Sequence, residues 1–169
     1  LAGEPASIES VITDFSTHGA FAKRVQVDYA SHCSLVDLIL PELEAAIGTI
    51  SGTYSSIPLY STVSDQIVHG TELSAAYLVR NLRQPVGYSR AVRRLLDDGF
   101  RFFIEISPHP LLQLATSAHF APLSDPAVYV SSIRREEGQR RHLLRAVAAL
   151  YVGGLPCDLS RQQPQPGRL

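Results

Sequence analysis

The sequence of 169 residues has no methionine and no tryptophan, and it has only two cysteines. Cys33 and Cys157 lie far apart and form no Cys-x-x-Cys pair, which argues against a disulfide framework and favours reduced thiols in a cytoplasmic protein. The lack of an initiator methionine indicates that the sequence starts inside a longer protein.

Long apolar runs and an excess of one charge are also missing. No apolar stretch reaches the ~18 residues that a membrane-spanning helix needs, and no leader of basic and then apolar residues opens the sequence. The net charge is −1, so nothing suggests nucleic acid or an anionic membrane as a partner. His109 and His119 stand apart with no third residue at ligand spacing, so we predict no metal site.

The elements predicted from the sequence alternate between helices and strands. Ile8, Val11, Ile12 and Phe15 form an apolar stripe of helical spacing that ends near Gly19. Strands are predicted over 21–27, 57–63, 102–106 and 127–133, and helices over 34–49 with a break at Pro41, 71–81, 90–98, 111–118 and 143–151. The mixed charges of 134–141 indicate a solvated loop and helix start. This alternation favours an α/β fold with a parallel sheet, which binds ligands at the carboxyl ends of its strands.

One stretch, 25–33, is the best candidate for a catalytic site. Val25 and Val27 alternate with polar residues, which predicts a short strand with one buried face, and the chain then passes Tyr29 and Ser31 to reach His32. A histidine just beyond a strand can take up and return a proton near neutral pH. From these residues alone, a structural histidine is the alternative.

Four segments carry a resemblance to a known family. Tyr29-Ala30-Ser31-His32 resembles the Tyr-Ala-Ser-His motif of the acyltransferase domains of modular polyketide synthases. Three others are similar to that family in the same order: Leu1-Ala2-Gly3-Glu4-Pro5, Arg80-Asn81-Leu82-Arg83-Gln84-Pro85-Val86 and Glu105-Ile106-Ser107-Pro108-His109-Pro110. The sequence therefore resembles the C-terminal part of such a malonyl/methylmalonyl-CoA:acyl carrier protein transacylase-like domain.

The resemblance implies a division of the chain. Residues 1–28 would be the C-terminal half of a ferredoxin-like small subdomain, and 29–152 the C-terminal part of an α/β-hydrolase-like large subdomain. Residues 153–169 would be the linker that follows the acyltransferase, because Leu155-Pro156-Cys157-Asp158-Leu159 resembles that linker. Its remainder, rich in proline and glutamine, is expected to be extended or disordered.

The resemblance also implies an activity and its site residues. In the family a serine takes the acyl group from acyl-coenzyme A and passes it to the phosphopantetheine thiol of acyl carrier protein, without a permanently bound cofactor. His32 matches the general base and acid, and Asn81 matches the residue whose backbone carbonyl orients that histidine; a helix C-cap is the other interpretation of Asn81.

Tyr29 and Ser31 match the pair that flanks the extender-unit pocket. Tyr-Ala-Ser-His accompanies methylmalonyl units, whereas malonyl enzymes usually carry His-Ala-Phe-His, and a small serine leaves room for the α-methyl group. Simple packing at a strand end is the other interpretation of Tyr29. Cys33-Ser34 replaces the more usual Ser-Pro, but a buried cysteine next to the base is more often inert than a nucleophile.

The nucleophile itself is not found. The sequence has no Gly-x-Ser-x-Gly motif, and it also lacks the family's substrate-binding arginine and its oxyanion-hole donors. We therefore expect a fragment that carries the base, is inactive alone and needs the missing N-terminal half of the acyltransferase. Its other expected partners are acyl carrier protein and the adjoining ketosynthase and other synthase domains.

Two alternatives stay open. A stand-alone malonyl-CoA transacylase of fatty-acid synthesis is disfavoured by the C-terminal linker and by the Tyr-Ala-Ser-His motif. A non-catalytic interaction or scaffold remnant is the other alternative, and a Gly-His-Ser-x-Gly motif before Leu1 would distinguish an enzyme half from such a remnant.

Overall fold

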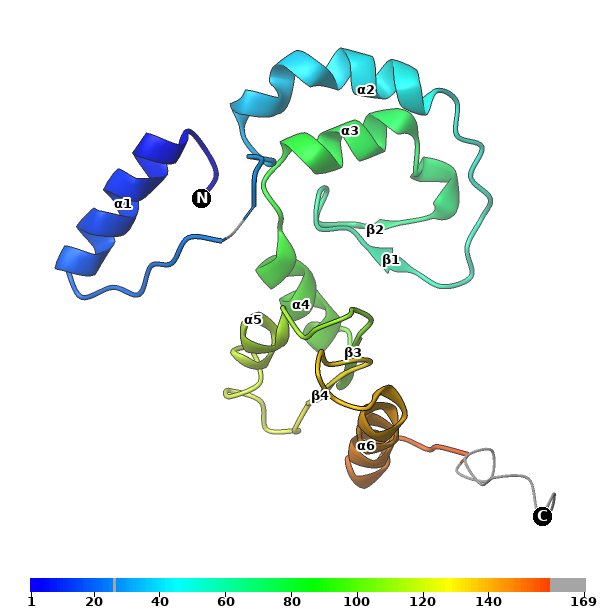
Figure 1. Ribbon diagram of the computed structural model, residues 1–169. Helices are drawn as coiled ribbons and strands as arrows, with labels where there is room; N and C mark the ends of the chain where they lie inside the picture. The colour runs from blue at the N-terminus through cyan, green and yellow to red at the C-terminus, as the bar shows by residue number, and fades with distance from the viewer. Residues whose placement is uncertain (26, 159–169) are drawn as a thin grey trace. The chain divides into compact units, whose positions relative to one another are not determined.

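The computed structural model describes residues 1–25 and 27–158, and the chain separates into two compact units, Leu1–Ala91 and Val92–Leu169. Both units contain helices and short strands (Figure 1), so the predicted α/β class is confirmed. Among the described residues, no helix combines the length and the apolar character needed to cross a membrane.

The first unit opens with α1 (Pro5–Thr17), the helix predicted from the apolar stripe. Pro5 stands in its first turn, where the missing N–H is not needed, and Gly19 ends it with a φ of +73° that residues with a Cβ rarely adopt. No residue of α1 is fully buried, and Phe15 is 44% exposed. The apolar stripe is therefore only partly buried, because Ile8, Val11 and Ile12 are half-buried.

The strand predicted over 21–27 is wrong. None of its described residues is in a strand, and the side chains of Val25 and Val27 are 71% and 47% exposed; Gln26 lies outside the described residues. A strand needs a partner for its backbone N–H and C=O groups, and no described strand pairs with this stretch. His32 therefore follows an irregular segment rather than a strand end.

The break predicted at Pro41 is confirmed. The chain forms a 3₁₀ helix, η1 (Ser34–Ile39), and then α2 (Leu40–Ile47), which has Pro41 in its first turn. Proline cannot donate a backbone hydrogen bond to the preceding turn, so one helix ends and another begins here. α2 lies beside α3 (Ala75–Arg83) in Figure 1, and η1 contacts the same helix.

Between these helices the chain forms a small antiparallel pair. β1 (Leu59–Tyr60) is shorter than the predicted strand, and β2 (Ile67–Val68) lies where no strand was predicted. A second 3₁₀ helix, η2 (Gly70–Glu72), follows, so the helix predicted over 71–81 begins only at Ala75, and Thr71 does not cap it. Ser74 does so instead, because its hydroxyl accepts from the amide of Tyr77 at 3.2 Å.

The second unit is built on a parallel pair, β3 (Phe102–Glu105) and β4 (Val128–Ser131), in register from Phe102↔Val128 to Glu105↔Ser131. α4 (Tyr88–Asp97) leads into the pair, and α5 (Gln113–Ser117) connects its strands. The predicted parallel pairing is thus confirmed. One face of β3 is incompletely covered, because the side chain of Ile104 is 51% exposed.

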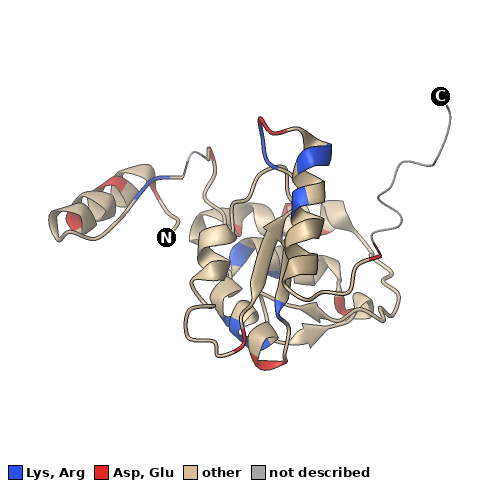
Figure 2. Ribbon diagram, turned by 90° about the horizontal axis from the view of Figure 1, so that it is seen from below, with Lys and Arg blue, Asp and Glu red and all other residues tan. Residues whose placement is uncertain are grey.

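α6 (Gln139–Val152) covers β4. Val130, Ala146 and Leu150 form the buried cluster between the two, and Phe102 and Val128 pack against it. Arginines stand at the start of α6 (Figure 2), and all residues of 135–141 are exposed, as expected for a solvated stretch. The proposed linker is described only as far as Asp158, and 159–169 lie outside the described residues.

Candidate active site

The backbone of His32 is fixed in an unusual conformation just before η1. Its φ is +62°, in the left-handed region that residues with a Cβ rarely occupy. Its amide donates to the carbonyl of Leu82 at 2.8 Å. Such a conformation persists where the surrounding structure enforces it, and it is more frequent at functional sites than elsewhere.

The ring of His32 is held at one nitrogen. Nδ1 lies 2.9 Å from the carbonyl oxygen of Gln84. A carbonyl only accepts, so Nδ1 must carry the proton, and in the neutral ring Nε2 then holds the free lone pair. No partner of Nε2 is recorded among the described residues. One nitrogen is therefore oriented and the other is available to accept a proton.

The end of α3 supplies both acceptors. The last carbonyls of a helix have no intrahelical partner, and Pro85 cannot extend the helix because it has no N–H. The amide of Gln84 still bonds to the carbonyl of Arg80 at 2.8 Å, but the carbonyls of Leu82 and Gln84 are left for the segment that contains His32.

The prediction that the Asn81 carbonyl orients His32 is therefore wrong. Asn81 is inside α3, so its carbonyl points along the helix axis, and the C-cap position belongs to Gln84. The backbone of Gln84 is extended rather than helical, with φ −79° and ψ 153°, and this turns its carbonyl away from the helix axis. The Leu82 and Gln84 acceptors were missed, and Pro85, which predicts the helix end, was the signal that could have found them.

Tyr29 and Ser31 lie in different surroundings. Tyr29 is 72% exposed and lines a groove of about 740 Å³ along the apolar stripe of α1. Ser31 is half-buried and adjoins His32 in the chain, but it does not line this groove. Of these two predicted site residues, Ser31 thus lies next to His32 in the chain, and Tyr29 lies on the groove.

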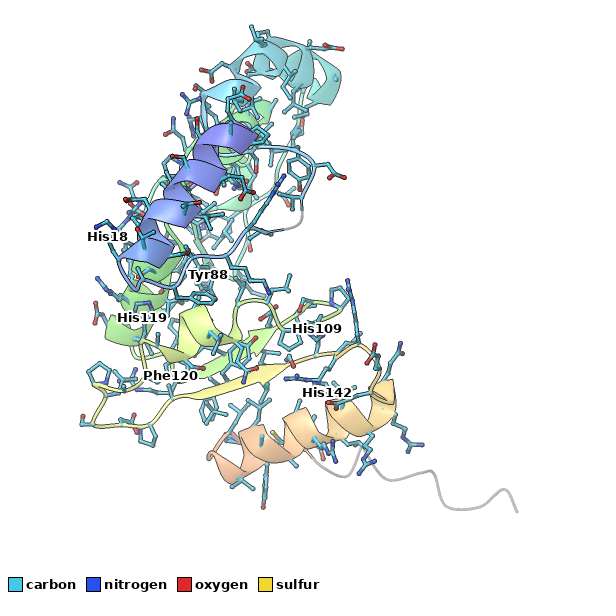
Figure 3. The ribbon with its side chains drawn as sticks, turned by 60° about the vertical axis from the view of Figure 1, so that its left-hand side comes forward. His18, Tyr88, His109, His119, Phe120 and His142 are labelled. Carbon is cyan, nitrogen blue, oxygen red and sulfur yellow. The ribbon has the colours of Figure 1, made fainter. Side chains whose placement is uncertain are left out.

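A second polar cluster lies at the carboxyl end of β3. Both oxygens of Glu105 accept hydrogen bonds: Oε1 from the amide of Leu111 at 2.9 Å, and Oε2 from the amide of Leu112 at 3.0 Å and from the hydroxyl of Tyr129. The hydroxyl of Ser107 lies 2.8 Å from Oε1. This carboxylate thus fastens the loop that contains His109 (Figure 3).

The same contacts set the pKa of Glu105. Desolvation by burial acts to raise it, but the hydrogen bonds from Tyr129, Leu111, Ser107 and Leu112 together outweigh burial and lower the pKa from 4.5 to about 2. A carboxyl whose pKa is lower in the folded state stabilises the fold above its unfolded pKa, and this contribution is lost as pH falls from 4.5 towards about 2.

We predict that Glu105→Gln lowers the free energy of unfolding at pH 7 by about 2 kcal/mol. The side-chain amide of glutamine has one oxygen and one NH₂ group, so it cannot accept the hydrogen bonds that reach both carboxylate oxygens of Glu105. Urea unfolding at pH 7 and at pH 3 measures this effect, and the difference between variant and parent should shrink at pH 3. Glu136→Gln, at an exposed site, is the control. Equal losses for the two variants would contradict the prediction.

A third contact, which sequence reasoning missed, joins α6 to β4. His142 extends from α6 towards β4 (Figure 3), with Nε2 3.0 Å from the hydroxyl of Ser131 and Nδ1 3.0 Å from a carboxylate oxygen of Glu137. The hydrogen bond from His142 is the main reason that the pKa of Glu137 is lowered. Since Ser131 is buried, with 7% of its surface exposed, this contact ties the elements together and offers no accessible hydroxyl.

Both the sequence and the fold match those of known proteins. A family model described as "Acyl transferase domain" matches residues 1–156, which is nearly the whole chain. The chain belongs to this family. Its α/β fold is also that of a solved structure, the acyltransferase domain from module 8 of the salinomycin polyketide synthase, with a TM-score of 0.89 and 35% identity over 94% of the chain.

Curated relatives of this acyl transferase chain are polyketide synthases. It is 37% identical over its full length to the spectinabilin polyketide synthase system protein NorC of Streptomyces orinoci, and 34% identical over 94% of its length to erythronolide synthase EryA2 of Saccharopolyspora erythraea. The chain spans only 7% and 4% of these two relatives, and 37% of the salinomycin acyltransferase chain.

Proposed function

We propose that the chain is the C-terminal, histidine-bearing part of a polyketide synthase acyltransferase, which loads a (methyl)malonyl extender unit from coenzyme A onto acyl carrier protein. The observation that carries the proposal is the geometry of His32. Its Nδ1 proton is bonded to a backbone carbonyl, and its Nε2 has no recorded partner among the described residues. A general base needs this arrangement of one oriented and one available nitrogen.

In the proposed reaction Nε2 of His32 takes the proton of a serine hydroxyl while the serine oxygen attacks the thioester carbonyl. The carbon–sulfur bond then breaks, the protonated ring returns its proton to the departing coenzyme A thiolate, and an acyl-serine remains. In the second half Nε2 takes the proton of the phosphopantetheine thiol, which attacks the acyl-serine. The proton finally returns to the serine oxygen as the new thioester forms.

The serine has to come from outside these residues, since no Gly-x-Ser-x-Gly motif occurs in them. We propose that the N-terminal half of the same acyltransferase provides it, together with the arginine for the substrate carboxylate and the oxyanion-hole donors. The relatives named above are consistent with this arrangement, because each is much longer than the chain. Further proposed partners are acyl carrier protein and the adjoining ketosynthase and other synthase domains.

The decisive test is made on the complete acyltransferase domain that contains these residues. We expect it to become labelled with radioactive methylmalonyl-coenzyme A and to pass the label to acyl carrier protein. Residues 1–169 alone should stay unlabelled, because the nucleophile is absent. Stable acylation of a serine in the isolated chain, or the lack of a Gly-His-Ser-x-Gly motif before Leu1 in the natural protein, would overturn the proposal.

We predict that Cys33→Ala in the complete domain changes kcat by less than about twofold. The thiol next to the base donates to the carbonyl of Ala30, with Sγ and O 3.4 Å apart, and this contact directs it to the main chain. A nucleophilic cysteine would instead need a thiolate open to substrate. Steady-state transfer to acyl carrier protein measures the effect, and a loss of more than tenfold would assign the thiol a chemical role.

A further inference from the structure

Three links connect the segment of His32 to the last turn of α3. Two are the hydrogen bonds to the carbonyls of Leu82 and Gln84. The third is an ion pair between Asp37, in η1, and Arg83, the last residue of α3. Arg83 stands between the two acceptors in the chain, so the ion pair acts on the same turn that holds the ring.

The ion pair has a two-point geometry. Nε of Arg83 donates to Oδ1 of Asp37, and Nη2 lies 3.5 Å from Oδ2 of the same carboxylate. A guanidinium that meets both oxygens of a carboxylate fixes relative orientation as well as distance. The pair therefore restricts how η1 can shift or rotate against the end of α3.

The pair is partly exposed, which bears on what it can do. The side chain of Arg83 is 32% exposed and that of Asp37 is 50% exposed. Ion pairs in such surroundings contribute little to global stability. The left-handed backbone of His32, however, is a conformation that persists only where the surrounding structure enforces it.

We propose that Asp37 and Arg83 are positioning residues for the base. Their ion pair holds η1 against the end of α3, and it thereby keeps Nδ1 of His32 on the Gln84 carbonyl and Nε2 available. This inference rests on the proposed function, in which His32 moves the proton. Both side chains are assigned here to positioning the base and not to binding the substrate, so their loss should lower kcat and leave KM nearly unchanged.

The test uses Arg83→Met and Asp37→Asn in the complete acyltransferase domain. Each should lower kcat about tenfold with less than about a twofold change in KM. A displaced base slows the chemical step of the reaction, whereas the binding of the substrate does not depend on it. ¹⁵N chemical shifts of the His32 ring, at a pH where the ring is neutral, report the tautomer. The parent should show the Nδ1–H tautomer alone, and both variants should show a mixture.

Two further variants sharpen the comparison. Arg83→Lys keeps the charge but not the two-point geometry, so its kcat should fall between those of the parent and Arg83→Met. Asp65→Asn is the matched control. Asp65 forms another exposed ion pair, with its Oδ2 2.7 Å from Nε of Arg90, and neither residue belongs to the turn that holds His32. Its kcat and its His32 tautomer should equal those of the parent.

The outcomes separate this inference from the proposed function. If the parent domain transfers no acyl group, the proposed function fails, whereas the tautomer measurement still tests the ion pair. If the parent is active and both variants keep its kcat and its single tautomer, the inference alone is overturned. A variant that loses thermal stability but keeps the Nδ1–H tautomer overturns it too, since the pair would then be merely structural.

Discussion

Replacing His32 by alanine should lower kcat for transfer to acyl carrier protein about 1,000-fold in the complete domain, the range expected for loss of a general acid and base. Methyl replaces an imidazole that moves a proton in both half-reactions, so acylation and deacylation should slow together. Rapid-quench measurement of acyl-serine formation and of its discharge to acyl carrier protein resolves the two halves.

His18→Ala is the matched control for this experiment. His18 lies at the end of α1, where Nδ1 is 2.8 Å from the carbonyl of Asp14, and no proton transfer is assigned to it. Its variant should retain the parent rate within about twofold. If His32→Ala kept more than a tenth of the parent activity, the assignment of the base would be wrong.

The double replacement Tyr29→His and Ser31→Phe should shift the preference from methylmalonyl towards malonyl units by about 10- to 100-fold in the ratio of kcat/KM values. The resemblance implies that Tyr29 and Ser31 flank the extender-unit pocket. A phenylalanine at 31 would then fill the space for the α-methyl group, and a methyl-sized difference in a pocket is worth about 1–3 kcal/mol. Competition between the two acyl-coenzyme A substrates at equal concentration measures the ratio directly.

Ser31→Ala separates size from polarity in this proposal. Alanine is as small as serine, so the ratio should stay within about twofold of the parent. A large loss of methylmalonyl preference in Ser31→Ala would mean that the hydroxyl, and not the space, selects the substrate. An unchanged ratio in the double variant would remove both positions from the pocket.

Local rules predicted the parts of this fold that depend on neighbours in the chain. The apolar stripe from Ile8 to Phe15 was enough for α1, because helical spacing and helix ends are set within a few residues. Pro41 located the boundary between η1 and α2 for the same reason. β3 and β4 were found from their apolar runs, and their parallel pairing follows from the connection through α5.

The errors fall where distant parts of the chain decide the outcome. The alternation of Val25 and Val27 indicated a strand, but a strand forms only where another strand pairs with it, and the described residues provide none. β2 is only two residues long, too short for a periodic signal. The carbonyl opposite His32 depends on where α3 ends, and sequence rules place helix ends only to within about two to four residues. The resemblance assigned this role to Asn81, whereas the carbonyl that meets the ring in this chain is that of Gln84, at the C-cap of α3.

The ring of His32 is held by the main-chain oxygen of Gln84 and its amide by that of Leu82, so the anchor does not depend on which amino acids stand at 82 and 84. Every residue brings the same oxygen, and the side chain of Gln84 is exposed. A substitution at position 84 can therefore change the outer surface there without disturbing the proton-carrying ring. What must be kept instead is the path of the backbone at the end of α3, and therefore Pro85, which stops the helix at this point.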